Sequence, residues 1–531
     1  MLNGYNTPMN FLSETFIIFL VVVCILYYCV PIKRRWIVLL LGSYAFYIMS
    51  CFTLMIFIML TTITIYGAAR LLEAIDESRR ALFDGKDEQW LEEHRAKWRQ
   101  KFQRQKRWVL TAALLFNFAI LFVFKYFQVF TSAINPIFRL LNFSEIGVWS
   151  TVILPLGISF YTFQTVGYLA DVYWGKVKSE KNIFKFALFT SFFPQLIQGP
   201  ISRFDQLAPQ LFKGNKWNWQ NFKKGLMLCA WGAFKMLCIS TPCFLIANSI
   251  IRGDTGFGGP IILLAYFLWG VYFYTSFSGG IDLARGIAQM LGVHMVENFA
   301  RPYFATSYSN YWSRWHITLG KWIADYVYYP IALSKWFGRF SRKFAKKVHG
   351  AAGKIIPSRM VAFICFLMIS LWHGGDPKWF LSGVFVASVV TCEAFFRMGT
   401  RKFFERHPKL TTQNLAIRIL TIVYTFFMVS ISRCILIGKN LGESLSIFKR
   451  LFTYGIPDNV TVTNEWEITA LAICLFILFV VGILQERGHN IRDFVVKQPS
   501  LVQLVYCIIF VLMIIFFASW GEGVVYVYGA V

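Results

Sequence analysis

Long apolar runs alternate with short charged stretches along the whole chain. The runs at 11–30, 108–134, 225–250 and 414–437 each approach or exceed the roughly 20 helical residues that cross a bilayer, and the run at 36–68 is long enough for two crossings. They do not show the strict alternation of barrel strands. Because backbone polar groups in lipid must be satisfied within a segment, the pattern predicts an all-α polytopic integral membrane protein with about 11 transmembrane helices.

Other stretches refine this pattern. Further crossings are predicted at 150–172, 259–293, 361–373, 379–396, 467–485 and 501–520. The apolar piece 187–198 is too short to span and meets Gly199-Pro200, which indicates a re-entrant or interfacial segment. Residues 303–335 are aromatic and amphipathic and are expected within the membrane boundary. Residues 70–107 mix acidic and basic side chains, which predicts helix extensions and a surface helix.

The basic residues give these helices an orientation. Lys33-Arg34-Arg35 follow the first apolar run, so the positive-inside rule places the N-terminus outside and residue 33 in the cytoplasm. The strongly basic stretch 336–359 and the cations after residue 396 flank two apolar arms, which predicts a hairpin with His373 at a tip away from the cytoplasm. The C-terminus is also expected outside. A net charge of +26 spread over such loops favours anionic lipid headgroups over nucleic acid as the partner.

The composition agrees with one membrane domain over residues 1–531. The chain is 56% hydrophobic and 15% charged, whereas soluble domains carry about 25% charged residues. Nearly all of the eleven cysteines fall inside apolar runs, without a Cys-x-x-Cys pair or a Cys and His cluster. They are expected to be small buried hydrophobes, and no metal site is predicted.

Two histidines stand apart from the five others. His316 and His373 each follow a tryptophan, and His373 ends an apolar run. An ionisable group at membrane depth is costly and is often functional, which also applies to Asp282. A neutral imidazole can act as the base in acyl transfer to a hydroxyl. The open alternative for each histidine is a structural hydrogen bond between helices.

Several motifs resemble the membrane-bound O-acyltransferase superfamily. They are Tyr311-Trp-Ser-Arg-Trp-His316-Ile-Thr-Leu, Asp325-Tyr-Val-Tyr-Tyr-Pro330 and Leu371-Trp-His373-Gly. Upstream motifs resemble its bacterial branch that includes the alginate O-acetylation membrane protein: Leu154-Pro-Leu-Gly-Ile-Ser-Phe-Tyr-Thr-Phe-Gln, Phe193-Pro-Gln-Leu-Ile-Gln-Gly-Pro-Ile, Phe277-Ser-Gly-Gly-Ile-Asp282 and Glu297-Asn-Phe-Ala-Arg-Pro-Tyr. The resemblance covers roughly 150–400.

The resemblance implies a fold around a central tunnel, with His373 as the catalytic histidine and His316 as the second. Residues implied to line the tunnel or bind substrate are Trp372, Arg314, Trp315, Asn298, Asp325, Asp282 and Gln198. The chain departs from the family at Ala324, where Arg or Lys is common, at Gly280, where a Tyr is found, and in a basic insertion around 336–354.

The implied activity is transfer of an acyl group, in this branch acetyl, from a cytoplasmic thioester such as acetyl-CoA toward hydroxyls of an extracytoplasmic polysaccharide. No permanently bound cofactor is expected. The implied partners are membrane lipids, the donor, the polysaccharide and a separate extracytoplasmic acyltransferase, at a bacterial plasma (inner) membrane. The alternatives are D-alanyl transfer to teichoic acid from a carrier protein, a lysophospholipid acyltransferase, and a transporter or channel. The last would show repeat symmetry, and the sequence shows none.

Overall fold

The structure is a computed structural model that describes residues 9–141, 143–144, 155–252, 257–453, 455 and 464–519. The described residues contain helices and no strand. Nine helical stretches within these ranges are long and apolar enough to cross a membrane. One of them, Ile32–Phe83, holds both α2 (Arg35–Cys51) and α3 (Met55–Phe83), and α1 (Glu14–Cys29) is a shorter apolar helix. The prediction of an all-α polytopic membrane protein with about 11 crossings is therefore confirmed.

The chain divides into two compact units, each built from two stretches of sequence. Unit 1 comprises Met1–Leu226 and Ala284–Val296, and unit 2 comprises Met227–Leu283 and Glu297–Val531. The long helices α9 (Trp219–Phe234) and α11 (Gly259–Met290) contribute residues to both. A single membrane domain over the whole chain stays a prediction.

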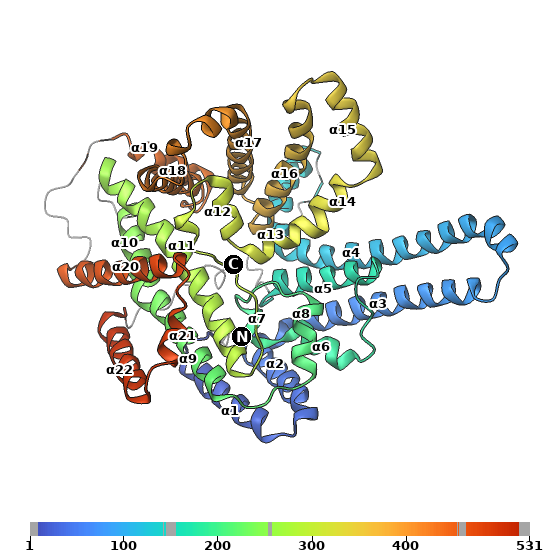
Figure 1. The fold of residues 1–531 in the computed structure, drawn as a ribbon, viewed down its shortest axis with the longest axis horizontal. Helices are drawn as coiled ribbons and strands as arrows, with labels where there is room; N and C mark the ends of the chain where they lie inside the picture. The colour runs from blue at the N-terminus through green and yellow to red at the C-terminus, as the bar shows by residue number, and fades with distance from the viewer. Residues whose placement is uncertain are drawn as a thin grey trace. The chain divides into compact units, whose positions relative to one another are not determined.

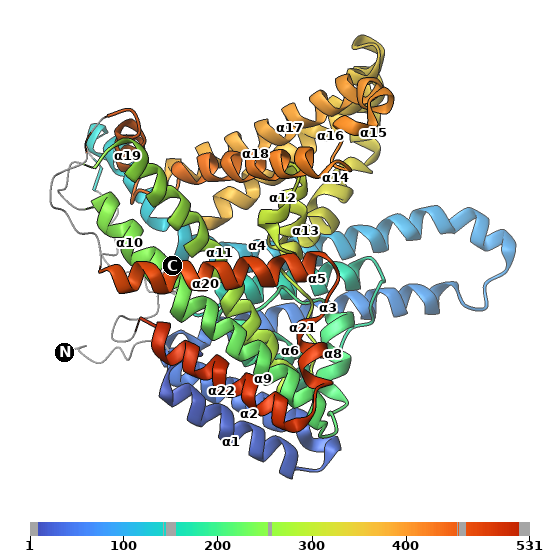
Figure 2. The same cartoon turned by 60° about the vertical axis from the view of Figure 1, so that its left-hand side comes forward.

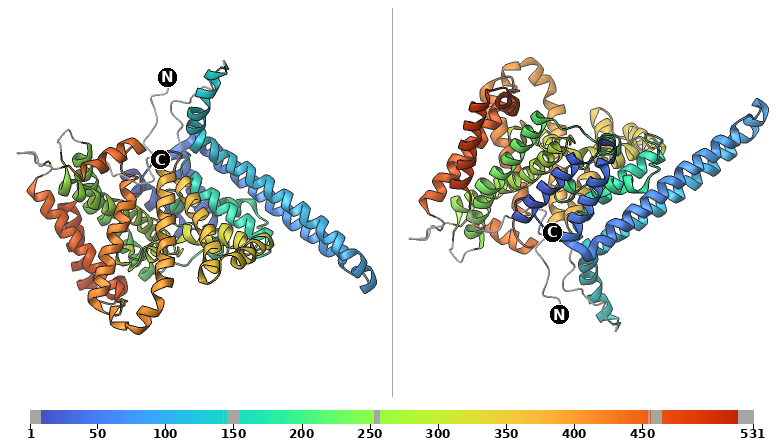
Figure 3. Two further views of the ribbon diagram at one scale, coloured as in Figure 1. Left: turned by 90° about the horizontal axis from the view of Figure 1, so that it is seen from above. Right: turned by 90° about the horizontal axis from the view of Figure 1, so that it is seen from below.

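In unit 1, α3 and α4 (Glu88–Leu140) pack side by side, and their charged ends extend beyond the other helices of that unit (Figures 1 and 3). Asp87 caps α4 by accepting a hydrogen bond from the Trp90 amide at 2.8 Å. The predicted helix extensions are confirmed. The prediction of a separate surface helix in 70–107 is wrong, because nearly all of the mixed-charge stretch belongs to α3 and α4, and only a short turn joins these two helices.

The other helices of unit 1 are short. They are α5 (Ile158–Tyr173), α6 (Ile183–Ser191), α7 (Phe193–Leu196) and α8 (Phe204–Phe212). Almost every residue of α5 is buried. The segment predicted as a re-entrant piece forms α6 and α7, which are broken at Phe192. Residues 150–154 of a predicted span lie outside the described residues, as does the C-terminal stretch 520–531.

Unit 2 holds the remaining helices. In chain order they are the π-helix η3 (Lys235–Ser240), α10 (Thr241–Arg252), α11, η4 (Pro302–Phe304), α12 (Tyr308–Arg314), α13 (Ile317–Ile323), the π-helix η5 (Ala324–Tyr328), α14 (Tyr329–Ala332), α15 (Lys335–Lys347), α16 (Ala351–His373), α17 (Pro377–Arg406), η6 (Pro408–Leu410), α18 (Leu415–Cys434), α19 (Leu441–Arg450), α20 (Glu465–Glu486), α21 (Ile491–Val496) and α22 (Ser500–Phe517). Helices α16 and α17 form the predicted hairpin, with α18 beside α17 (Figure 2).

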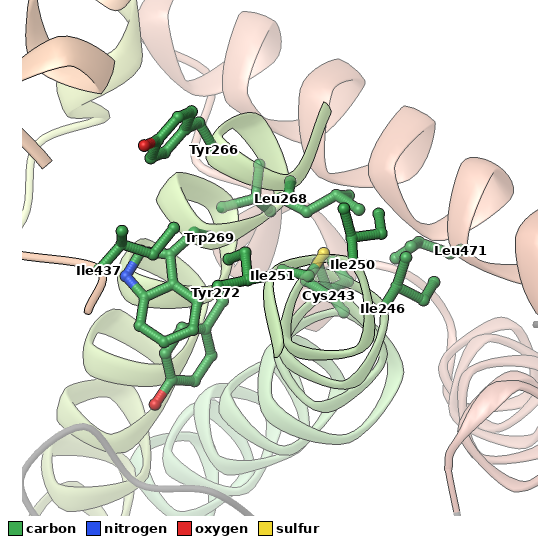
Figure 4. Packing of buried hydrophobic residues seen from close by; sticks show 14 of the residues in the cluster. Cys243, Ile246, Ile250, Ile251, Tyr266, Leu268, Trp269, Tyr272, Ile437 and Leu471 are labelled. Carbon is green, nitrogen blue, oxygen red and sulfur yellow. The ribbon is translucent and has the colours of Figure 1, made fainter. Parts of the chain in front are cut away.

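Two apolar clusters stabilise unit 2. In the larger one, Ile246 and Ile250 of α10 pack with Trp269 and Tyr272 of α11 and with Leu471 of α20 (Figure 4). The smaller cluster joins α12, α17 and α18 through Ala305, Tyr308, Tyr311, Val386, Val390 and Val429. Trp312 and Trp315, which precede His316 in the sequence, pack against this second cluster, so it holds that segment in place.

Candidate active site

The chain turns sharply at two residues on either side of α12. Arg301 (φ 48°) and His316 (φ 46°) are the non-glycine residues with positive φ among those described. Such left-handed conformations cost about 1–3 kcal/mol each and persist only where the surroundings hold them. Here two backbone hydrogen bonds join the segments that contain them, from the Ala300 amide to the Arg314 carbonyl and from the Ile317 amide to the Asn298 carbonyl, both at 3.0 Å.

Asn298 fixes the ring of His316. The Asn298 Oδ1 accepts hydrogen bonds from the amide and the hydroxyl of Thr318, both at 2.9 Å. The Asn298 Nδ2 lies 3.1 Å from His316 Nδ1. The Asn298 Oδ1 also lies 3.3 Å from His316 Nδ1, but it already accepts from two donors, so we assign the closer Nδ2 as the donor and Nδ1 as the acceptor. The neutral ring therefore carries its proton on Nε2, and this atom is buried without a hydrogen-bond partner among the described residues.

Burial also sets the charge of this ring. His316 is buried between α12 and α13, outside the candidate membrane spans, and Phe277 packs edge-on against it at 4.9 Å. Burial lowers the pKa of His316 to about 3, because an imidazolium loses its hydration there. His316 is therefore neutral at any physiological pH.

This pKa predicts a specific loss of stability in acid. The unfolded chain binds a proton at His316 below pH of about 6.5, whereas the folded chain does so only near pH 3. The contribution of this ring is thus complete above about pH 6.5 and is lost as the pH falls. Between pH 7 and 5.5 the wild type should lose about 1 kcal/mol more stability than His316→Asn. Asparagine tolerates the left-handed backbone. Thermal unfolding in detergent measures this, and equal acid losses in both proteins would refute it.

His373 is held at the tip of the α16–α17 hairpin. It is the last residue of α16, and its ring stacks on the indole of Trp379 with centroids 5.2 Å apart and planes at 21°. The Trp372 indole packs on it at 4.7 Å. The Ser370 hydroxyl donates to the Trp379 carbonyl at 2.6 Å, and Asp376 caps α17. These contacts fix the turn between α16 and α17 and the position of the His373 ring.

Gly374 leaves room for the Trp379 indole to stack on the His373 ring. A Cβ on Gly374 would lie 2.4 Å from Nε1 of Trp379. Because an indole ring cannot bend away, Gly374→Ala should displace Trp379 from the His373 ring and cost about 1–3 kcal/mol, as overpacking does. Thermal unfolding measures the loss. Gly399→Ala on α17 is the matched control, since its Cβ would meet nothing within 4 Å. It should be neutral or stabilising by up to about 1 kcal/mol, and equal effects of the two changes would contradict the geometry.

The two histidines lie on the wall of one cavity inside unit 2. Its volume is about 190 Å³. The lining residues come from α12, α13, η5 and α16: Trp312, Trp315, His316, Leu319, Gly320, Ile323, Ala324, Tyr328, Ala362, Cys365, Phe366, Ile369 and His373. The wall is apolar apart from the imidazoles and a few polar tips, and the cavity is partly open, so a small apolar group could lie beside the two imidazole rings.

The other predicted site residues take different places. Trp315 lines the cavity. Asn298 contacts the ring of His316, and Trp372 packs on the ring of His373. Asp325 belongs to η5, between two lining residues. Asp282 of α11 pairs with the buried Lys235 at 2.7 Å. Gln198 belongs to unit 1 and is not among the lining residues.

Arg314 lies in an ion-pair network rather than on the cavity wall. Its two terminal nitrogens each lie 3.0 Å from an oxygen of Glu486, the last residue of α20. Arg301 donates to the same carboxylate at 2.8 Å, and Arg418 lies 3.6 Å from it. This network joins the two tight corners to α20.

The sequence interpretation did not single out several of these residues. Arg433 of α18 lies over the Trp315 ring at 4.6 Å and donates to the Gly270 carbonyl and the Tyr303 and Tyr311 hydroxyls. Lys235 and Arg433 are cations inside apolar spans, so the rule that marked His373 could have found both. Glu486 lies at a span end and Trp379 in an ordinary helix, where no sequence signal marks them. Among the described residues, no three His, Cys, Asp or Glu side chains lie close enough to hold a metal ion.

Comparison with known proteins gives this site its chemical context. Residues 177–345 match the membrane-bound O-acyltransferase family, which includes His316 but ends before His373. The chain is 28% identical to the probable alginate O-acetylase AlgI of Azotobacter vinelandii over 74% of this chain and 71% of that protein.

Two other relatives have different acceptors in their names. The chain is 27% identical to the peptidoglycan O-acetyltransferase of Helicobacter pylori, over 65% of this chain and 64% of that protein. It is also 27% identical to the teichoic acid D-alanyltransferase of Bacillus subtilis, over 54% and 69%. The predicted resemblance and enzyme class are confirmed: the protein is an acyltransferase, residues 177–345 match the membrane-bound O-acyltransferase family, and alginate O-acetylases are similar to it over most of the chain.

Proposed function

We propose that this acyltransferase moves an acetyl group from a cytoplasmic thioester donor toward hydroxyls of an extracytoplasmic polysaccharide, with His373 as the general base. The single observation that carries this proposal is the cavity whose apolar wall holds both His316 and His373. A base and a hydrogen-bond donor in a largely apolar site are the parts that acyl transfer to a hydroxyl needs.

The proposed step uses one group on each side of the cavity. The acceptor hydroxyl attacks the thioester carbonyl carbon, and its proton passes to His373. The carbonyl oxygen becomes negative, and His316 is suited to donate to it, because its neutral ring carries a proton on the unpartnered Nε2. The carbon–sulfur bond then breaks and the thiolate takes the proton from His373. The products are an ester and a free thiol.

Donor, acceptor and orientation rest on the relatives and on the charge map. The names of relatives specify alginate, peptidoglycan and teichoic acid as acceptors, all of them polymers with free hydroxyls. The basic flanks of the α16–α17 hairpin support an orientation in which the His373 tip lies away from the cytoplasm. We assign the protein to a bacterial plasma membrane with both termini outside. Acetyl-CoA is the proposed donor, and a separate extracytoplasmic acyltransferase is the proposed partner that completes delivery.

A second candidate is D-alanyl transfer from a carrier protein. The observation that favours it is the similarity to the teichoic acid D-alanyltransferase, which covers 54% of this chain. Proteoliposomes separate the two. Acetyl-CoA or a D-alanyl carrier protein is supplied on the face where the basic loops are exposed. Polysaccharide or teichoic acid is supplied on the other face together with the partner acyltransferase, and ester formation on the polymer is measured. The proposal expects transfer from acetyl-CoA to polysaccharide. Transfer that occurs only with the D-alanyl carrier protein would overturn it in favour of the second candidate.

A further inference from the structure

Helix α15 joins the two histidine-bearing parts of the site and is strongly basic. It follows α14 and leads into α16, which ends at His373. The thirteen residues from Lys335 to Lys347 contain six Lys or Arg and no acidic residue. Every one of these cations is exposed: Lys335, Arg339, Arg342, Lys343, Lys346 and Lys347. No acidic side chain of the helix itself neutralises this face.

The opposite face of α15 is aromatic and only partly covered. Phe337 is buried, and Phe340 and Phe344 are half-buried along the same stripe. Trp336 stacks on Phe340 at 6.2 Å but remains 66% exposed, and Leu333 just before the helix is 80% exposed. A helix with a basic face and an apolar face that ends in an exposed tryptophan is typical of the membrane interface.

The connection to α16 keeps this helix close to the bilayer. Four residue steps separate Lys347 from Ala351, the first residue of α16, and the apolar span of that helix begins at Ile355. Four steps of extended chain cover at most about 14 Å. The C-terminal end of α15 therefore stays within about one and a half Debye lengths of the start of α16, where an anionic surface attracts cations.

We propose that α15 binds the anionic lipid headgroups of the leaflet next to it and thereby anchors α16 at a fixed depth. The cations would contact lipid phosphates, while Trp336 and Leu333 would insert at the edge of the acyl chains. A docking site for an acidic protein would use the same charges. It would leave the exposed Trp336 and Leu333 unexplained beside a span, so the lipid surface fits the helix better.

Charge removal tests this proposal on the full-length protein. The lipid-facing variant is Arg339→Gln/Arg342→Gln/Lys343→Gln/Lys346→Gln. The matched control removes four exposed cations from the charged ends of α3 and α4 and the turn between them, where acidic residues intervene: Arg80→Gln/Lys86→Gln/Arg95→Gln/Lys97→Gln. A third protein, Arg339→Lys/Arg342→Lys/Lys343→Arg/Lys346→Arg, keeps the charge. Thermal unfolding in detergent first shows that each protein folds.

Retained lipid is the measurement. Each protein is placed in nanodiscs of phosphatidylcholine and phosphatidylglycerol, and native mass spectrometry counts the phosphatidylglycerol molecules it keeps. Each cation near an anionic surface contributes about fivefold to binding, so the α15 Gln variant should lose more than tenfold in phosphatidylglycerol affinity. The control variant of α3 and α4 and the charge-keeping protein should keep the wild-type affinity for phosphatidylglycerol. Raising the ionic strength from about 0.1 M to about 1 M, which shortens the Debye length from about 10 to about 3 Å, should weaken wild-type binding in the same way.

Equal retention of phosphatidylglycerol by the wild type and the α15 Gln variant would overturn the proposal. If an acidic acyl-carrier protein also binds to the wild type and not to the variant, α15 is a protein-docking helix instead. Both readouts are independent of catalysis, so they are informative whatever the acyl donor and acceptor are.

Discussion

Replacing His373 by glutamine is expected to lower the rate of acyl transfer by about 10²- to 10⁴-fold, the usual contribution of a general base. Glutamine has no group that can take a proton from a hydroxyl at neutral pH. Its length and its amide can still occupy the space against Trp379 at the hairpin tip. The loss should therefore fall on the rate, while the donor still binds and the thermal unfolding curve stays close to that of the wild type.

His407→Gln is the matched control for this change. His407 is exposed after the end of α17, and its ring nitrogen contacts the Phe403 carbonyl of its own helix. This variant should transfer acyl groups at the wild-type rate. Wild-type activity of His373→Gln at normal protein levels would exclude His373 as the base and leave it with a structural role.

Replacing Glu486 by glutamine is expected to destabilise the folded protein by about 3 kcal/mol, near the lower end of the range for breaking a buried ion pair. The Glu486 side chain is 14% exposed, and it faces Arg301 and Arg314 at 2.8 and 3.0 Å. Without its charge, two guanidinium groups remain partly buried beside a neutral amide. Both of them border the tight corners at Arg301 and His316, so transfer activity should fall together with stability. Thermal unfolding in detergent and an acyl-transfer assay measure the two effects.

Glu405→Gln provides the comparison. Glu405 pairs with Arg401 at 2.7 Å, but both side chains are more than half exposed. Exposed pairs contribute only about 0.2–1 kcal/mol, so this variant should unfold almost as the wild type does. If Glu486→Gln and Glu405→Gln have equally small effects, the network around Glu486 is not what holds the two corners.

Apolar length and basic flanks were sufficient to predict most of the fold. The α16–α17 hairpin and the position of His373 at its tip follow from two apolar arms between basic stretches. The break between α2 and α3 divides the run at 36–68, which was predicted to hold two crossings.

The two histidines of the candidate site could be predicted from the sequence. The residues that hold them in place could not. Nothing in a run of aromatic residues signals that His316 adopts a left-handed backbone, since this conformation depends on Asn298 and Thr318. Glu486 is separated from Arg314 by 172 residues, and local periodicity carries no information over such a distance. Arg433 differs, because it lies inside an apolar span and its cost at membrane depth was visible in the sequence.

The central claim is that acyl transfer takes place in the cavity between His316 and His373. Photolabelling tests it most directly, with a pantetheine thioester whose short acyl chain carries a diazirine, because pantetheine is common to coenzyme A and carrier-protein donors. The labelled peptides are mapped by mass spectrometry with and without competing acetyl-CoA, in the wild type and in His373→Gln. The account predicts competed labelling on the cavity wall, within 312–328 and 362–373, in both proteins. Labelling confined to other helices would contradict transfer in this cavity. So would labelling of these two segments that acetyl-CoA does not displace.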